Sequence, residues 1–309
     1  MGILRTDRGV SSMLSFETED KFIDLHTHST SSDGSLEPDA LVRHAYGLGL
    51  AAVALTDHDT VSGVGAALEE GEKLGMEVIP GVEISVSLSS WELPAFTRSH
   101  AEPEMHLLGY FFSGSYELLA GTLDELQQKR EQRNPKIIAK LRELGFDITL
   151  EEAARKAAGG IVGRPHIARV LLEKGYISSI SEGFDRYLAA GRPAYFRKDK
   201  LTPEEGIAEI IRAGGVPVLA HPIYLGIGGR QLGEVLVRLK AAGLKGIEAI
   251  YTENTKEQTE ELLKLAEEYD LKVTGGSDFH GSFKPDIEAG TGRGGLRIPY
   301  SLLSALKEV

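Results

Sequence analysis

The sequence predicts an α/β protein built around a barrel of seven parallel strands, with a helical segment inserted into it. Short apolar, β-branched runs alternate with helical patterns along most of the chain, which is typical of strand–helix–strand units. The central stretch, residues 113–200, has helical patterns and no convincing strand. We therefore expect a first part of the barrel over 20–112, the insertion over 113–200, and a second part of the barrel over 201–309.

The predicted strands and helices follow one another in chain order. The first half reads as strand KFIDLHTH, helix LVRHAYGLGL, strand AAVALTDHD, helix VGAALEEGEKLG, and strands MEVIPGVEIS and EMHLLGYFF. The second half reads as strand VPVLAHP, helix VLVRLKAAGL, strand GIEAIY, helix TEELLKLAEEY and strand KVTGGSDFH. Alternation of this kind favours a barrel over an antiparallel sandwich.

The insertion begins with a long helical pattern and continues in shorter ones. The long pattern is LLAGTLDELQQKREQRNPKIIAKLRELG, and the shorter ones are EEAARKAA, RPHIARVLLEKG and EGFDRYLAAG. It carries 16 Lys and Arg against 12 Asp and Glu, whereas the rest of the chain carries 18 against 34. This positive segment is where a phosphate-bearing substrate can be held, although solvated helix faces explain the charge equally well.

The composition excludes several classes of protein. There are no cysteines, so disulfides, thiolate metal sites and a cysteine nucleophile are ruled out. The net charge of −12 argues against stable binding of duplex nucleic acid, which requires many cations to neutralise phosphates. There is no apolar run of membrane-spanning length, and the first twenty residues lack the apolar core of a secretory signal. We expect a cytoplasmic protein that does not bind membranes.

Potential metal ligands lie at the ends of the predicted strands. His26 and His28 are two residues apart, so in a strand both side chains face the same side. The active site of a (βα) barrel lies at the carboxyl ends of its strands. The candidates found there are His26, His28, Asp57, His58, Asp59, Glu83, His106, His221, Asp278 and His280, with Asp33 in the loop after the first strand. Six of the nine histidines fall in this set, which makes chance placement a poor explanation.

These ligands indicate the kind of metal that the site would take. Histidine and carboxylate without sulfur suit Mn²⁺, Zn²⁺ or Fe²⁺ better than Ca²⁺, and so many ligands imply more than one ion. Asp57 and Asp59 are weaker candidates, because TDHDT is also a helix N-terminal signal. Glu83 can bridge two cations.

The motifs resemble those of the PHP family, the polymerase-and-histidinol-phosphatase metallophosphoesterases. The matching stretches, in family order, are DLHTHSTSSDG, LTDHDT, PGVEIS, HLLGYF, LAHP and GGSDFHG. The resemblance implies a distorted (βα)7 barrel with a trinuclear metal centre. By motif, the first ion would be held by His26, His28, Glu83 and Asp278, the second by Glu83, His106 and His221, and the third by Asp33, His58 and His280.

The helical middle is similar to one subgroup of that family, the 3′,5′-nucleoside bisphosphate phosphatases and 5′-to-3′ exoribonucleases. The stretches that carry this likeness are KREQRN, GRPHIARVLLEKG and FDRYLAAGRPAYF. Arginine binds phosphate through two parallel charge-assisted bonds, so the substrate-binding candidates are Arg130, Arg133, Arg164 and His166. A surface ion pair or a helix cap is the alternative role for each of them.

The resemblance implies a hydrolase that acts on phosphate esters of small nucleotides such as pAp (adenosine 3′,5′-bisphosphate), AMP-like compounds or short 5′-phosphorylated RNA. Two or three divalent ions, Mn²⁺ first among them, would supply a metal-bound hydroxide. His26, Glu83 and Asp278 would organise it, and His166 is a candidate to protonate the leaving oxygen. Histidinol-phosphate phosphatase, a non-catalytic metal-binding PHP module and a TIM-like amidohydrolase are the alternatives. The last of these does not predict TDHD or Asp33.

Overall fold

The computed structural model describes residues 21–89, 91, 104–112, 115–156, 162–189, 191–196 and 200–309, without the side chains of residues 127 and 129–131. Its strands are β1 (Ile23–Thr27), β2 (Ala52–Leu55), β3 (Glu77–Ser87), β4 (Glu104–Tyr110), β5 (Val216–Leu219), β6 (Gly246–Tyr251) and β7 (Lys272–Gly276). Its α-helices are α2 (Pro38–Gly47), α3 (Val64–Leu74), α4 (Glu117–Glu143), α5 (Leu150–Lys156), α6 (Arg164–Glu173), α7 (Ile180–Gly183), α8 (Pro203–Arg212), α9 (Gly229–Ala242), α10 (Lys256–Glu268) and α11 (Tyr300–Lys307). Short helical turns are η3 (Phe184–Leu188), η4 (Pro222–Leu225) and η5 (Gly281–Phe283).

The seven strands form one sheet in chain order, which confirms the predicted barrel. The sheet curls until β7 meets β1. Just beyond the end of β7, the amide of Asp278 donates to the carbonyl of His26 at 2.9 Å, and the amide of His28 donates to the carbonyl of Phe279 at 2.9 Å. These bonds bring the two ends of the sheet together and nearly close the barrel.

The direction of β4 departs from the parallel arrangement predicted for it. β4 is antiparallel to both β3 and β5, whereas the other neighbouring strands run parallel. No helical pattern separates the third and fourth predicted strands, and only a parallel pair needs a long crossover between its strands. As a result, the amino end of β4 lies at the edge of the barrel where β3 and β5 have their carboxyl ends.

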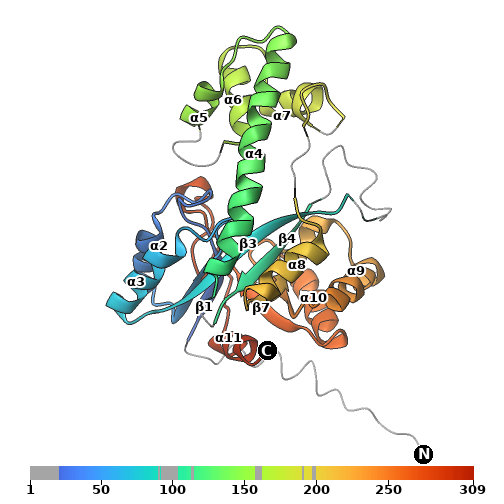
Figure 1. Cartoon of the computed structure of the whole chain (residues 1–309). Coiled ribbons are helices and arrows are strands. Elements are labelled where there is room, and N and C mark those ends of the chain that lie inside the picture. Colours follow the sequence, from blue (N-terminus) through green and yellow to red (C-terminus); the bar gives the residue numbers. More distant parts are fainter. Residues whose placement is uncertain are drawn as a thin grey trace, which may run out of the picture.

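Helices cover the outside of the barrel (Figure 1). β1 and β2 are buried along their whole length, as expected of strands that are covered on both faces. Leu25 and Ala54 pack with Leu303 of α11 in one cluster. Val82 and Ile84 of β3 belong to a second cluster, which includes residues of α4, α8, α9 and α10. Apolar clusters on both sides of the sheet therefore hold the strands in place.

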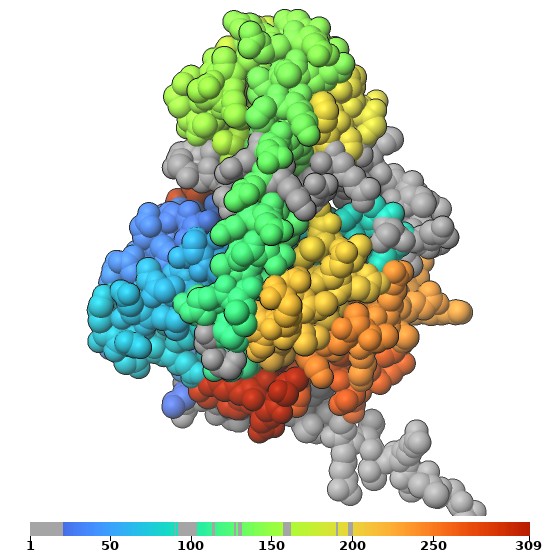
Figure 2. All heavy atoms as spheres, viewed as in Figure 1, coloured from blue at the N-terminus to red at the C-terminus, as the bar shows by residue number. Residues whose placement is uncertain are grey.

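The insertion between β4 and α8 rises from the barrel on the long helix α4 (Figures 1 and 2). Leu119 and Leu123, near the start of α4, belong to the core of the barrel. Ile137 and Leu141, further along, belong to a separate core shared with α5, α6 and η3. The helix has 27 residues and is about 40 Å long, so it connects two hydrophobic cores. Within the described part of the chain, no helix combines the length and apolar character needed to cross a membrane.

A buried carboxylate reinforces the junction of β1 with β7. Asp24 is fully buried, and its oxygens accept from the amide and hydroxyl of Ser277, at 3.0 and 2.5 Å. They also accept from the amides of Gly290 at 2.7 Å and of His26 at 3.1 Å. Burial raises the pKa of Asp24, and these four bonds oppose that rise. Asp24 thus ties β1 to the end of β7 and to the loop that follows.

Replacing Asp24 by alanine should weaken this closure. The change leaves several buried donors without an acceptor, so we expect the free energy of unfolding to fall by about 2–4 kcal/mol, measured by urea denaturation. Asp124→Ala, at an exposed position of α4, is the control and should leave the midpoint close to the wild-type value. Equal midpoints for the two variants would contradict this role of Asp24.

Candidate metal centre

The predicted ligands meet at one edge of the barrel because each supporting segment ends or begins there. His26 and His28 lie at the end of β1 and just after it. β3 pairs with β2 only up to Pro80 and continues beyond it, so Glu83 projects past the end of β2. His106 is the third residue of β4, and it reaches the same edge because β4 runs in the opposite direction.

Glu83 lies at the middle of the cluster and is fully buried. Its Oε1 lies 2.8 Å from His106 Nδ1 and 2.8 Å from His221 Nε2. Its Oε2 lies 3.3 Å from Nε2 of His26 and of His28, and 3.0 Å from His58 Nδ1. A single carboxylate therefore contacts five imidazoles from four segments of the chain.

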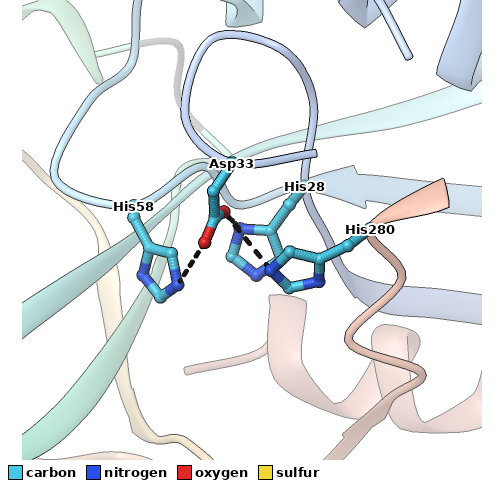
Figure 3. A group of neighbouring side chains, drawn as sticks. All are labelled: His28, Asp33, His58 and His280. Carbon is cyan, nitrogen blue, oxygen red and sulfur yellow. Dashed lines mark ion pairs between the residues drawn. The ribbon is translucent and has the colours of Figure 1, made fainter. Parts of the chain in front are cut away.

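All nine side chains named from the sequence as metal ligands fall into overlapping groups whose ligand atoms lie within 4.8 Å of one another. These groups are His28, Asp33, His58 and His280; His26, His28 and Asp278; His26, Glu83 and His221; and His58, Glu83 and His106. In the first group, Asp33 lies between His58 and His280, with His28 behind it (Figure 3). Its oxygens are 3.7 Å from His58 Nε2 and 3.3 Å from His280 Nε2.

Several buried polar atoms of the cluster point to cations as their missing partners. His26 Nε2, both ring nitrogens of His28, His58 Nδ1 and Glu83 Oε2 are buried and have no hydrogen-bond partner among the described residues. Buried polar atoms are normally hydrogen-bonded, because an unsatisfied one costs free energy. Imidazole nitrogens and carboxylate oxygens are ligands of Mn²⁺, Zn²⁺ and Fe²⁺. The residues present therefore fit a group of divalent ions.

Electrostatics keeps the carboxylates of the cluster ionised. Burial alone would raise the pKa of Glu83, but His58, His106 and His26 hold it well below the usual range. The pKa of Asp278 is also held well below its usual range, against its burial, by the close contact with His28 and the charge of His26. Burial, with a contribution from His58, lowers the pKa of His28 to about 3. His28 is thus a neutral imidazole, the form that binds a metal.

The backbone around the cluster is strained at residues that carry ligands. His221 and Asp278 have φ angles of 21° and 58°, which non-glycine residues rarely adopt. At Gly276 a Cβ atom would lie 2.1 Å from the Cβ of His26, so only glycine allows β7 to approach β1 this closely. This approach brings Asp278 to within 3.2 Å of His28 Nε2.

Three further residues hold the cluster in place, and sequence analysis did not assign them this role. Asp57 accepts from the amide and hydroxyl of Ser29 at 2.7 and 2.6 Å and from the hydroxyl of Ser32 at 2.6 Å, so it shapes the loop that carries Asp33. Tyr251 donates to Asp278 Oδ2 at 2.9 Å. Glu248 is fully buried in β6 and contacts His26. A charged residue inside the apolar strand GIEAIY is the signal that would have identified Glu248.

The cluster opens into a cleft of about 1170 Å³ between the barrel and the insertion. Besides the ligands, the walls carry a set of positive side chains, Arg133, Lys156, Arg164, Lys200 and Lys284. Lys200 pairs with Glu104, and Lys284 Nζ lies 2.7 Å from Asp278 Oδ2. An anion that enters the cleft therefore meets cations from both the insertion and the barrel.

Three of the four predicted substrate-binding residues line this cleft. Arg164 donates to the carbonyl of Leu188 at 2.9 Å, and its guanidinium carbon lies 5.3 Å from the centre of the Tyr195 ring. His166 Nδ1 accepts from the amide of Gly163 at 3.0 Å, and Arg133 is buried at the cleft wall. The side chain of Arg130 lies outside the described residues.

Comparison with known proteins places the chain in a family. The 5′-3′ exoribonuclease of Haemophilus influenzae is 35% identical over 84% of this chain and 90% of its own length. The 3′,5′-nucleoside bisphosphate phosphatase of Chromobacterium violaceum is 29% identical over 84% of this chain and 87% of its own length.

A solved structure agrees with this result. The crystal structure of a protein from Bifidobacterium adolescentis, assigned to the metal-dependent phosphoesterases, superposes with a TM-score of 0.71 at 29% identity and covers 93% of this chain and 96% of that one. Residues 24–209, which include most of the predicted ligands and the whole insertion, match the PHP domain. The chain is a member of the PHP domain family.

Proposed function

We propose that this protein is a metal-dependent phosphoesterase that hydrolyses phosphate esters of small nucleotides, either 3′,5′-bisphosphonucleotides such as pAp or short 5′-phosphorylated RNA. The observation that carries the proposal is the convergence of nine metal-ligand side chains at the floor of a cleft whose walls are lined with cations. The names of the two relatives, an exoribonuclease and a nucleoside bisphosphate phosphatase, support both the reaction and the substrate class.

Two of the ligand groups support a first and a third position for divalent ions, and Glu83 Oε1, which lies 2.8 Å from both His106 and His221, supports a second. One would be held by His26, His28, Asp278 and Glu83, a second by Glu83, His106 and His221, and a third by Asp33, His58 and His280. Mn²⁺ is the ion we propose, because the ligands are nitrogen and oxygen only. Ions bound there would lower the pKa of a water ligand toward about 7 and neutralise the phosphoryl oxygens.

The insertion supplies residues that would recognise the phosphate. Within the described part of the chain, Arg164 contacts a carbonyl and two aromatic rings rather than a carboxylate, so its charge is available to an anion in the cleft. Because His166 Nδ1 accepts a hydrogen bond, the hydrogen of the neutral ring is on Nε2. His166 would then donate to a phosphate or to the leaving oxygen.

The cleft also offers aromatic surface for a nucleobase. Tyr224 and Phe283 line it and are 56% and 68% exposed. An exposed ring beside a metal cluster offers a flat face on which a base can stack. Phe283 belongs to the turn that follows His280, so a base stacked on it would lie beside the proposed metal positions.

The first prediction concerns metal and substrate together. After removal of metal and reconstitution with Mn²⁺, elemental analysis should find two or three ions per chain. The loaded protein should release phosphate from pAp, or nucleotides from 5′-phosphorylated oligonucleotides, faster than it hydrolyses histidinol phosphate. His26→Ala should lower the metal content and abolish turnover. His44→Ala is the control, because His44 pairs with Glu288 outside the cluster. One ion or fewer in the wild-type protein would refute the proposed centre.

A second prediction separates phosphate recognition from metal binding. Arg164→Ala should retain the wild-type metal content and lower kcat/KM for pAp by about tenfold to a hundredfold, the loss expected of one charge-assisted hydrogen bond of about 1.5–3 kcal/mol. The loss should be smaller for a simple chromogenic monoester, which has no second phosphate. Arg169→Ala, an exposed arginine of the same helix, is the control. A wild-type rate on pAp would remove Arg164 from the substrate site.

A third prediction tests the aromatic surface. Phe283→Ser should raise KM for pAp about fivefold to a hundredfold, because stacking of one base contributes about 1–3 kcal/mol. The kinetics on ribose 3,5-bisphosphate, which has no base, should not change. Tyr46→Ser removes another exposed ring, on α2 and outside the residues that line the cleft, and should affect neither substrate. Equal losses on the two bisphosphates would rule out base stacking on Phe283.

A further inference from the structure

Glu248 lies behind the metal cluster and belongs to none of the ligand groups found among the described residues. It is fully buried in the middle of β6. Its Oε1 lies 3.0 Å from His26 Nδ1, and its Oε2 accepts from the backbone amide of His221 at 2.8 Å. One carboxylate therefore contacts two residues that belong to different proposed metal positions.

The contact with His26 determines which ring nitrogen is free for a metal. A neutral imidazole carries its hydrogen on one nitrogen only. When His26 is neutral, as it must be to bind a metal, the carboxylate oxygen 3.0 Å from Nδ1 keeps the hydrogen there, and the lone pair is then on Nε2. Nε2 is the atom that faces Glu83 Oε2 at 3.3 Å and Asp278 Oδ1 at 3.7 Å. Glu248 thus selects the tautomer in which His26 presents a ligand atom to the cluster.

The contact with His221 holds a backbone conformation that would otherwise relax. His221 has φ 21° and ψ 67°, a strained combination for a residue with a side chain. In this conformation its Nε2 lies 2.8 Å from Glu83 Oε1. The bond from its amide to Glu248 is one of the interactions that keep the ring directed at the cluster.

We propose that Glu248 is a positioning residue for the metal centre, which fixes the His26 tautomer and the His221 backbone together. The proposal rests on the metal binding proposed above. Both partners of Glu248 are donors, the Nδ1–H of His26 and the amide of His221, and only a carboxylate offers two acceptor oxygens. A glutamine of the same shape satisfies one of them and directs its NH₂ group at the other.

The test is Glu248→Gln, with Glu70→Gln as the control. Glu70 is also buried, pairs with Arg43 and Lys73 on α2 and α3, and has no contact with the centre. Calorimetric titration of metal-free protein with Mn²⁺ should show ten- to hundredfold weaker binding at the positions that use His26 and His221, the usual effect of losing an outer-shell partner. The position made by Asp33, His58 and His280 should keep its affinity, and E70Q should behave as wild type.

A second measurement reports the bond between His26 and Glu248. In the Zn²⁺-loaded, ¹⁵N-histidine-labelled protein, NMR should show the Nδ1–H of His26 as a downfield, exchange-protected signal in the wild type. In E248Q this signal should move upfield or broaden by exchange, because an amide is a weaker acceptor than a carboxylate. If E248Q lowers the thermal midpoint of the metal-free protein but binds Mn²⁺ with unchanged affinity, the role of Glu248 is structural and the inference is overturned. If the wild-type protein binds no divalent ion, the proposed function fails instead.

Discussion

The contact of one buried carboxylate with five imidazoles is the constraint on which the rest of the site depends. Glu83 has no access to water, and its two oxygens lie 2.8–3.3 Å from nitrogens of His26, His28, His58, His106 and His221. A buried charge is tolerated only when it is paired. The histidines that pair with it come from segments that meet at one edge of the barrel: the ends of β1, β2 and β5 and the start of β4.

A second set of buried acidic residues holds the residues around Glu83 in place. Asp24 ties β1 to Ser277, Asp57 shapes the loop of Asp33, and Glu248 links His26 to His221. Each is a carboxylate that links its own segment of the chain to at least one other. Because a carboxylate has two acceptor oxygens in a fixed geometry, it fixes the relative position of two segments more strictly than apolar packing does. The geometry of the candidate metal centre therefore depends also on residues that would not bind an ion themselves.

In the proposed reaction, the barrel would bind the metal ions and the insertion would bind the substrate. The barrel provides all nine candidate ligands, and the insertion provides Arg133, Lys156, Arg164 and His166 on the opposite wall of the cleft. α4 is shared between the two hydrophobic cores, so the distance between these walls is set by a helix rather than by a flexible linker. Substitutions in the insertion can therefore change which phosphate ester is held without altering the metal ligands.

The sequence by itself determined the features that are encoded locally. Strand periodicity placed the seven strands, and polar residues at the ends of apolar runs identified a set of candidate ligands, because strand ends are where a barrel exposes side chains. The resemblance to the PHP family narrowed this set to nine by leaving out Asp57 and Asp59. Only the tertiary structure decided features that depend on pairing between distant segments. The reversed direction of β4 follows from a connection without a crossover helix, and it is what carries His106 to the site. The role of Glu248 could not be predicted from the sequence, because its partners His26 and His221 lie 222 and 27 residues away. No local sequence pattern shows which groups a buried carboxylate contacts.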